Sequence, residues 1–193
     1  MSNSLSASVS PGYRLGPLEF ATGMSGLNAW TYLYVCLAIM PVISFLSFSQ
    51  PYVLTEIIGI PPERHGQVTG LLITMHEIVV LALVSFAGGL SDRLGRRPLY
   101  ATGTLVAGAG FAIYGMASTV GDLYVGRFVY AIGLAFVGVM IAVTAADYPA
   151  ENSRGKIAGV SGVLNGLGIG IATALFAALP AIFKSQGMTS AEA

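Results

Sequence analysis

The sequence contains very little charge. Of its 193 residues only 9% are Asp, Glu, Lys or Arg, and the formal net charge is zero. Soluble domains carry about 25% charged residues, so a chain of this composition could not cover a water-facing surface. Because there is no basic excess, nothing indicates a nucleic-acid partner.

Cysteine and histidine are almost absent as well. The single cysteine, Cys36, excludes an intrachain disulfide and a cysteine-rich metal site. The two histidines, His65 and His76, form no metal-ligand set, and the sequence has no phosphate-binding loop of the Walker type. We therefore predict a protein that is not an enzyme and that holds neither a metal nor a cofactor.

Apolar residues dominate instead. They make up 54% of the chain and gather in five runs, each long enough for the about 20 residues that a helix needs to cross a bilayer. The predicted spans are residues 28–53, 66–90, 98–117, 122–146 and 157–183. The sequence thus predicts an all-α, polytopic membrane protein embedded in the lipid bilayer.

The charges of the loops predict the orientation, because Lys and Arg favour the cytoplasmic side of a membrane. We expect residues 1–27 to be a cytoplasmic tail, residues 28–183 the helical bundle and residues 184–193 an outside loop. The segments expected inside hold six basic residues: Arg14, Arg93, Arg96, Arg97, Arg154 and Lys156. The segments expected outside hold only Arg64 and Lys184. This asymmetry predicts a multi-pass protein of the plasma (inner) membrane with its N-terminus in the cytoplasm.

The stretch between the second and third spans combines glycine with charge. It reads Gly88-Gly89-Leu90-Ser91-Asp92-Arg93-Leu94-Gly95-Arg96-Arg97-Pro98. Its glycines permit a tight reversal with positive φ, and Asp92 can pair with a guanidinium. An ordinary cytoplasmic loop would explain the arginines, but neither the glycines nor Asp92.

This stretch resembles the signature loop of the major facilitator superfamily, Gly-x-Leu-x-Asp-Arg-x-Gly-Arg-Arg, which joins the second and third helices of that family. Seven positions match in register: Gly88, Leu90, Asp92, Arg93, Gly95, Arg96 and Arg97. Residues 147–159 also look like the family, with Asp147 and Arg154 matching its loop between the fourth and fifth helices. The resemblance implies that Asp147 pairs with an arginine of the signature loop, with Arg96 the first choice. These residues would form a latch between the inner ends of helices in one state of a transport cycle.

The start of the fourth span is similar to another motif of the family, Leu-x-x-x-Arg-x-x-Gln-Gly-x-Gly. Leu123, Arg127 and Gly133 match it, whereas Tyr130 and Ala131 depart from it. The resemblance links Arg127 to proton movement. The alternative is that Arg127, which lies close to the outer end of its helix, snorkels to the membrane interface.

His76 and Glu77 lie near the middle of the second span, where ionisable groups are costly and usually face a cavity or a partner. At about 100° per residue, Glu77 and Thr74 share a face with mostly polar or small residues. That face comprises Gln67, Gly70, Thr74, Glu77, Leu81, Ser85 and Gly88. We predict that Thr74 and Glu77 line a proton or substrate path. The alternatives are a static pairing of Glu77 with Arg127 or His76, and a hydrogen-bonded packing role for His76.

The fifth span carries a row of glycines at about four-residue spacing: Gly155, Gly159, Gly162, Gly166 and Gly170. Such a row predicts a close-packing face against another helix. Asn165 shares a neighbouring face with Ser161, Gly168 and Ala172, where it could contact substrate or form an interhelical hydrogen bond. No Gly-Pro pair like that of the family's drug antiporters occurs in this span, which favours a symporter or a uniporter.

The family resemblance implies two bundles of six helices, so five spans correspond to an N-terminal half truncated before its sixth helix. We expect the gene product to continue beyond Ala193 with a further span, a linker and a second bundle, and this missing C-terminal half is an expected partner. The predicted function is secondary transport of a small-molecule substrate by alternating access, coupled to protons. The alternative is a non-transporting membrane sensor or assembly subunit that keeps the same fold.

The latch leads to a first prediction. We expect Asp92→Asn and Arg96→Ala each to cripple transport in the complete protein while membrane insertion stays intact, because losing one member of a shielded charge cluster biases the conformational equilibrium. Solute uptake measured against membrane expression checks this. Normal uptake by both variants at wild-type expression would rule the latch out.

Overall fold

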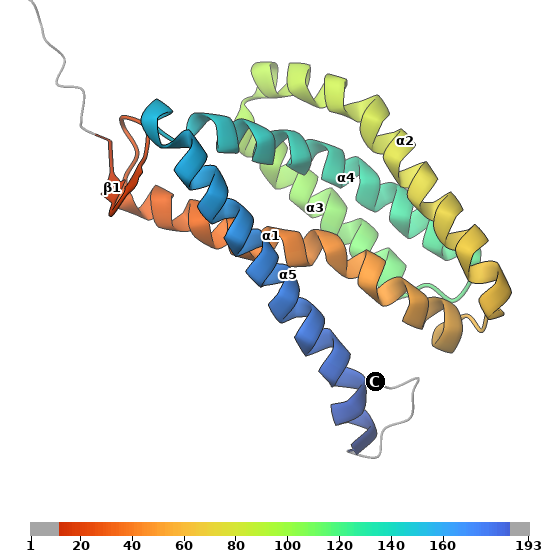
Figure 1. The fold of residues 1–193 in the computed structure, drawn as a ribbon. Helices are drawn as coiled ribbons and strands as arrows, with labels where there is room; N and C mark the ends of the chain where they lie inside the picture. Colours follow the sequence, from red (N-terminus) through yellow and green to blue (C-terminus); the bar gives the residue numbers. More distant parts are fainter. Residues whose placement is uncertain (1–11, 186–193) are drawn as a thin grey trace, which may run out of the picture. The chain divides into compact units, whose positions relative to one another are not determined.

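The computed structural model describes residues 12–185, and the side chains of residues 12–175. Its elements are, in order, β1 (Arg14–Leu15), β2 (Leu18–Glu19), α1 (Gly26–Tyr52), a π-helix (Val53–Ile57), α2 (Pro62–Leu94), α3 (Arg96–Gly115), α4 (Val120–Asp147), a 3-10 helix (Glu151–Ser153) and α5 (Arg154–Ser185) (Figure 1). The outermost parts of the predicted tail and outside loop, residues 1–11 and 186–193, lie outside the described residues.

The predicted fold class is confirmed, since a helix occupies each of the five predicted spans. Among the described residues, four helical segments are long and apolar enough to cross a membrane: Gly26–Ile57, Pro62–Leu94, Val120–Asp147 and Glu151–Leu175. The 20-residue helix α3 is not one of them. Its glycine, threonine and tyrosine residues lower its mean hydropathy, and these same small residues serve helix packing.

The signature stretch is almost entirely helical. α2 continues into it, and α3 begins directly after Gly95. Gly95 has a φ of +88° and donates its N–H to the carbonyl of Ser91 at 2.9 Å, a backbone conformation that favours glycine. Gly88 and Gly89 are helical, and no described residue lies within 4 Å of a Cβ built on either one. The expectation that these two glycines serve the reversal is therefore wrong.

α4, which carries Arg127, begins with a capping box. The Asp122 carboxylate accepts hydrogen bonds from the backbone N–H groups of Ser118 at 3.1 Å and Thr119 at 2.9 Å. In return, the backbone N–H of Asp122 donates to the Thr119 hydroxyl at 3.2 Å. These reciprocal bonds satisfy N–H groups that a helix start leaves without intrahelical partners.

The chain forms two compact units. Among the described residues, one comprises residues 12–43 and 144–175, and the other comprises residues 44–143 and 176–185. The second unit therefore contains α2, α3 and most of α4. The first contains the hairpin β1–β2, the first part of α1, and α5 as far as Leu175.

In the second unit, α3 and α4 run side by side at close range (Figure 1). A Cβ at Gly110 would overlap the backbone of Tyr130, and a Cβ at Gly133 would overlap the backbone of Ala107. A Cβ at Gly126 would come within 2.7 Å of the Tyr114 nitrogen. Small residues let helix backbones approach in this way, and close packing is the main attraction between helices in lipid.

The first unit shows that part of the predicted tail is folded. Gly16, with a φ of +57°, and Pro17 form the two-residue turn of the hairpin, in which Leu15 is opposite Leu18. Glycine at the first turn position suits such a tight hairpin. Phe20 follows β2 and is only 2% exposed, because it packs into an apolar cluster with the start of α1 and with Ile157 of α5.

α5 packs against α1 through a face other than its glycine row. A Cβ at Gly168 would overlap the carbonyl of Leu37 and lie 3.1 Å from the Pro41 ring, and the hydroxyls of Ser161 and Tyr32 are hydrogen-bonded at 3.1 Å. The predicted packing row consists of Gly155, Gly159, Gly162, Gly166 and Gly170. Within the described part of the chain, nothing lies within 4 Å of a Cβ on any glycine of that row.

The α3–α4 contact generates a second prediction. We expect Gly110→Ala and Gly133→Ala each to lower the free energy of unfolding by about 1–3 kcal/mol, because the added methyl group overlaps backbone atoms that cannot move independently. Thermal unfolding in detergent measures this. Gly108→Ala on α3 and Gly138→Ala on α4 are matched controls, since open space surrounds both positions. Equal unfolding temperatures for all four variants would contradict the close approach.

Candidate functional site

The polar face of α2 is uncovered in the described structure. Six of the seven residues predicted to share this face are exposed: Gln67, Gly70, Thr74, Glu77, Leu81 and Ser85. The seventh, Gly88, is half-buried. The Thr74 hydroxyl donates a hydrogen bond to the Gly70 carbonyl of its own helix at 2.8 Å. Glu77 is the ionisable group on this face. The role of this face as a proton or substrate path stays a prediction.

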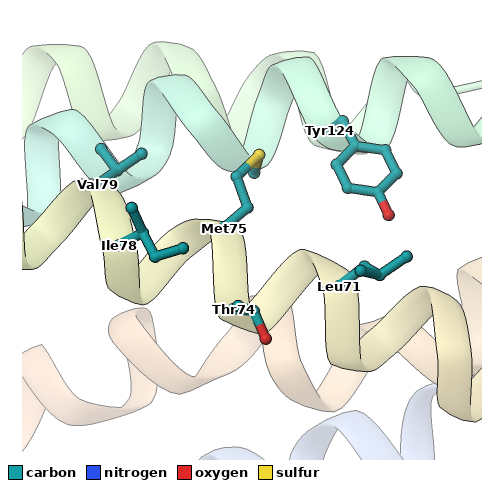
Figure 2. A pocket seen from close by; sticks show the side chains of 6 residues that line it. All are labelled: Leu71, Thr74, Met75, Ile78, Val79 and Tyr124. Carbon is teal, nitrogen blue, oxygen red and sulfur yellow. The ribbon is translucent and has the colours of Figure 1, made fainter.

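A shallow apolar groove lies where α2 and α4 meet, and it includes Thr74 of the polar face. Its cavity volume is about 340 Å³. Figure 2 shows its lining: Leu71, Thr74, Met75, Ile78 and Val79 from α2, and Tyr124 from α4. The groove offers apolar contacts with a polar edge, which is the usual character of a small-molecule site.

Arg127 lies inside the second unit. Its side chain is 5% exposed, and its Nε and Nη1 atoms have no hydrogen-bond partner among the described residues. It interacts electrostatically with Tyr114 of α3, with Tyr130 of its own helix and with Glu77 of α2. Burial of this kind does not agree with the snorkelling alternative, because snorkelling would leave the guanidinium in contact with water.

His76 is buried, whereas its neighbour Glu77, about 100° away around α2, is exposed. His76 is 7% exposed, and its ring lies 5.9 Å from that of Tyr130 at an interplanar angle of 30°. It also interacts electrostatically with Arg127. The His76 ring is therefore packed, as the predicted packing role requires. Its Nδ1 atom, however, has no hydrogen-bond partner within the part of the chain described.

The structure thus brings together residues that the sequence did not connect. His76 from α2, Tyr114 from α3, and Arg127 and Tyr130 from α4 form one buried polar cluster. The Tyr114 hydroxyl, like the Arg127 and His76 atoms named above, lacks a hydrogen-bond partner among the described residues. Tyr130 is also a position at which the fourth-helix pattern is broken, and here its ring stacks on His76. That departure is the one sequence signal from which the cluster could have been inferred.

The latch residues lie at helix ends. In the second unit Asp92, Arg93, Arg96 and Arg97 are exposed around Gly95, and Ser91 is buried, where its hydroxyl contacts the Met140 sulfur at 3.8 Å. In the first unit the exposed Asp147 ends α4 and the exposed Arg154 begins α5. The pairing of Asp147 with Arg96 would join residues of different units and stays a prediction.

Asn165 is half-buried on the face of α5 that also holds Ser161 and Gly168. That face packs against α1, as the shared periodicity indicated. The Asn165 Oδ1 atom is buried and accepts no hydrogen bond from any described residue. The alternative of an interhelical hydrogen bond to this oxygen is therefore not met among the described residues, and the substrate contact stays a prediction. Among the described residues, no three His, Cys, Asp or Glu side chains are placed to hold a metal ion.

Comparison with known proteins assigns the family. The model of the Major Facilitator Superfamily matches residues 20–188, which include all five helices from α1 to α5. The chain belongs to the major facilitator superfamily. The matched range confirms the resemblance of the signature stretch.

Several known proteins are similar to parts of the chain. Magnetosome protein MamZ of Magnetospirillum gryphiswaldense is 30% identical over 153 residues, which cover 74% of this chain and 23% of that protein. A class G tetracycline resistance protein of Vibrio anguillarum is 31% identical over 131 residues, covering 68% of this chain and 31% of that protein. Multidrug transporter protein MdtP of Bacillus subtilis is 32% identical over 111 residues, covering 55% of this chain and 20% of its own length.

The chain therefore spans between 20% and 31% of the length of these three relatives. No solved structure matches the chain. As a member of this superfamily the chain is part of a multi-pass membrane protein, and its four long apolar segments agree with that assignment.

The buried cluster generates a third prediction. We expect Tyr114→Phe to leave the free energy of unfolding unchanged or slightly higher, because the hydroxyl it removes is buried without a hydrogen-bond partner. Thermal unfolding in detergent measures this, with Tyr124→Phe in the open groove as the control. A loss of more than about 1 kcal/mol would mean that the Tyr114 hydroxyl is hydrogen-bonded in the membrane.

Proposed function

We propose that this chain forms part of a secondary transporter that moves a small solute by alternating access and couples that movement to protons. The observation that carries the proposal is the uncovered polar face of α2, with Glu77 at its centre, in a member of a transporter superfamily. A charged residue at the middle of a membrane helix costs about 2.5–3.5 kcal/mol on insertion scales. Such a residue is retained where it faces a solute path or a partner group.

In this proposal Glu77 takes up and releases the proton, and Thr74 contacts the solute one turn away. Thr74 also lines the apolar groove between α2 and α4, so a solute held there would meet an apolar wall and a polar edge. Asn165, with its buried oxygen free of hydrogen bonds among the described residues, is a further candidate for the path. The solute itself would be small, which agrees with the names of the relatives that act in tetracycline resistance and multidrug transport.

Arg127 is proposed to be the charged partner of Glu77 on the neighbouring helix. The two residues interact electrostatically, and a buried guanidinium whose donors are not all satisfied favours an approaching carboxylate. Loss of the Glu77 charge on protonation would weaken that attraction. A proton could thereby change the arrangement of α2 and α4 within the second unit.

The latch is proposed to stabilise one state of the cycle on the cytoplasmic side of the plasma membrane. It comprises Gly88, Asp92, Arg93, Gly95, Arg96 and Arg97 of the signature stretch, together with Asp147 and Arg154. The exposure of the charged members at helix ends supports a role in contacts that form and break. The remainder of the facilitator fold would supply the other wall of the solute path.

The decisive test is a transport assay, which forms the fourth prediction. We expect Glu77→Gln to abolish solute accumulation driven by a pH gradient, because an amide cannot carry the proton, and to retain exchange of solute across the membrane. Uptake into energised vesicles at several pH values measures the first, and counterflow with labelled solute measures the second. A tetracycline, chosen for the resistance protein among the relatives, is the first probe.

Glu63→Gln is the matched control, since Glu63 is an exposed glutamate in the first turn of the same helix. It should transport like the unaltered protein. A pH dependence of uptake that is the same in Glu77→Gln and in the unaltered protein contradicts the role of Glu77. Absence of uptake for every tested solute would instead favour the non-transporting sensor or assembly subunit, which the magnetosome relatives leave open.

A further inference from the structure

The hairpin β1–β2 is tied to the turn between α4 and α5, residues 147–154, by backbone hydrogen bonds. The N–H of Ala21 donates to the carbonyl of Tyr148 at 2.9 Å, and the N–H of Ala150 donates to the carbonyl of Glu19 at 3.0 Å. Phe20 is thereby paired with Pro149 in an antiparallel bridge. The hairpin and the turn belong to the same unit, so this contact is part of a single compact body.

Side chains of the hairpin extend the contact. The Glu19 carboxylate accepts a hydrogen bond from the Asn152 amide at 2.7 Å and forms an ion pair with Arg14, also at 2.7 Å. The backbone N–H of Glu19 donates to the buried hydroxyl of Ser153 at 3.2 Å. An exposed ion pair stabilises little by itself, so Arg14 mainly orients Glu19 toward Asn152.

Buried aromatic rings also contact the 147–154 turn. Phe20 meets the ring of Tyr32 edge-on at 6.3 Å, and Tyr32 packs on Tyr148 of the turn at 5.7 Å. The Tyr32 hydroxyl is hydrogen-bonded to Ser161 of α5 at 3.1 Å. Tyr32 of α1 therefore connects the hairpin, the turn and α5 in one buried cluster.

This turn is the segment that carries two of the proposed latch residues. Asp147 lies directly before Tyr148, and Arg154 directly after Ser153. Every residue from 148 to 153 except Glu151 is named above as a partner of the hairpin or of Tyr32. The carboxylate and the guanidinium thus extend from a short segment that the hairpin holds at both ends.

We propose that Glu19 and Phe20 are positioning residues, which hold the 147–154 turn so that Asp147 and Arg154 are presented in one fixed geometry throughout the transport cycle. The inference rests on the proposed function and adds a segment outside the helices to its machinery. It treats the hairpin as a permanent strap, because Phe20 is almost completely buried while the latch residues themselves are exposed.

The fifth prediction tests the strap with Phe20→Ala in the full-length protein. Loss of the buried ring should speed amide hydrogen exchange in residues 148–153 by roughly tenfold, because local opening becomes easier, and should lower uptake by about fivefold at normal membrane expression. Phe48→Ala is the matched control, since that ring is exposed. It should change neither the exchange of the turn nor the uptake.

An engineered disulfide between the hairpin and the turn, a covalent tie, can distinguish two causes of lost uptake in Phe20→Ala. One cause is a displaced turn, and the other is a general loss of stability. Glu19 and Ala150 flank the bridge between Phe20 and Pro149 as an opposed pair, and opposed residues of antiparallel strands lie within disulfide range. We expect a disulfide between Glu19→Cys and Ala150→Cys to restore slow exchange and uptake to Phe20→Ala when oxidised, and reduction to remove the rescue. In a chain that keeps Phe20, oxidation of the tie should not lower uptake below that of the same chain in its reduced form. Ala150→Cys alone controls for effects of the oxidant.

Three results would overturn the inference. Unaltered exchange of residues 148–153 in Phe20→Ala would show that the hairpin does not hold the turn. Failure of the oxidised tie to restore uptake, although exchange is again slow, would show that the turn's position does not matter for transport. Loss of uptake on oxidation in the chain that keeps Phe20 would show that the strap must release. If the unaltered protein transports nothing, the proposed function fails, while the exchange measurement still decides whether the hairpin holds the turn.

Discussion

The backbone approach of α3 and α4 is the contact on which the second unit depends. Helices in lipid gain little from the hydrophobic effect, since the surrounding tails are as apolar as their side chains, so close packing must hold them together. Gly110, Gly126 and Gly133 provide that packing by letting one backbone touch the other. The same approach places Tyr114 beside Gly126 and Tyr130 beside Gly110, and these tyrosines surround the guanidinium of Arg127.

Two neighbouring residues of α2 lie in different environments, one buried and one exposed. His76 is directed into the buried cluster, whereas Glu77 is exposed on the polar face. Adjacent residues of a helix differ by about 100° in direction, so the two neighbours cannot share a face. Because Arg127 interacts electrostatically with both, the interior of the unit and its uncovered face are electrostatically linked across the width of one helix. The proposed proton coupling depends on that link.

The first unit follows a different principle. Its hairpin and the 147–154 turn are joined by backbone hydrogen bonds and by buried aromatic rings rather than by small residues. Such a contact resembles the core of a soluble domain, in which apolar burial stabilises the contact and hydrogen bonds select one arrangement. A rigid end of this type is suited to presenting charged residues at fixed positions.

The sequence by itself determined the fold class, the five helices, the family and the polar face of α2. These properties follow from hydropathy, from helical periodicity and from a motif that is continuous along the chain. Each depends only on residues that are close together in the sequence, so the sequence was sufficient to predict them. It also contained the hairpin signal, Gly16-Pro17 between apolar residues, but the polar surroundings favoured a tail. Only the tertiary structure decided that Arg127 is buried with His76 and Tyr114, that Gly95 alone makes the reversal, and that Gly168 rather than the neighbouring glycine row packs α5 on α1. Each of these features depends on which face of a helix contacts which neighbouring helix. The same sequence periodicity is compatible with many rotations of a helix about its own axis, and only side-chain packing in the folded protein selects one of them.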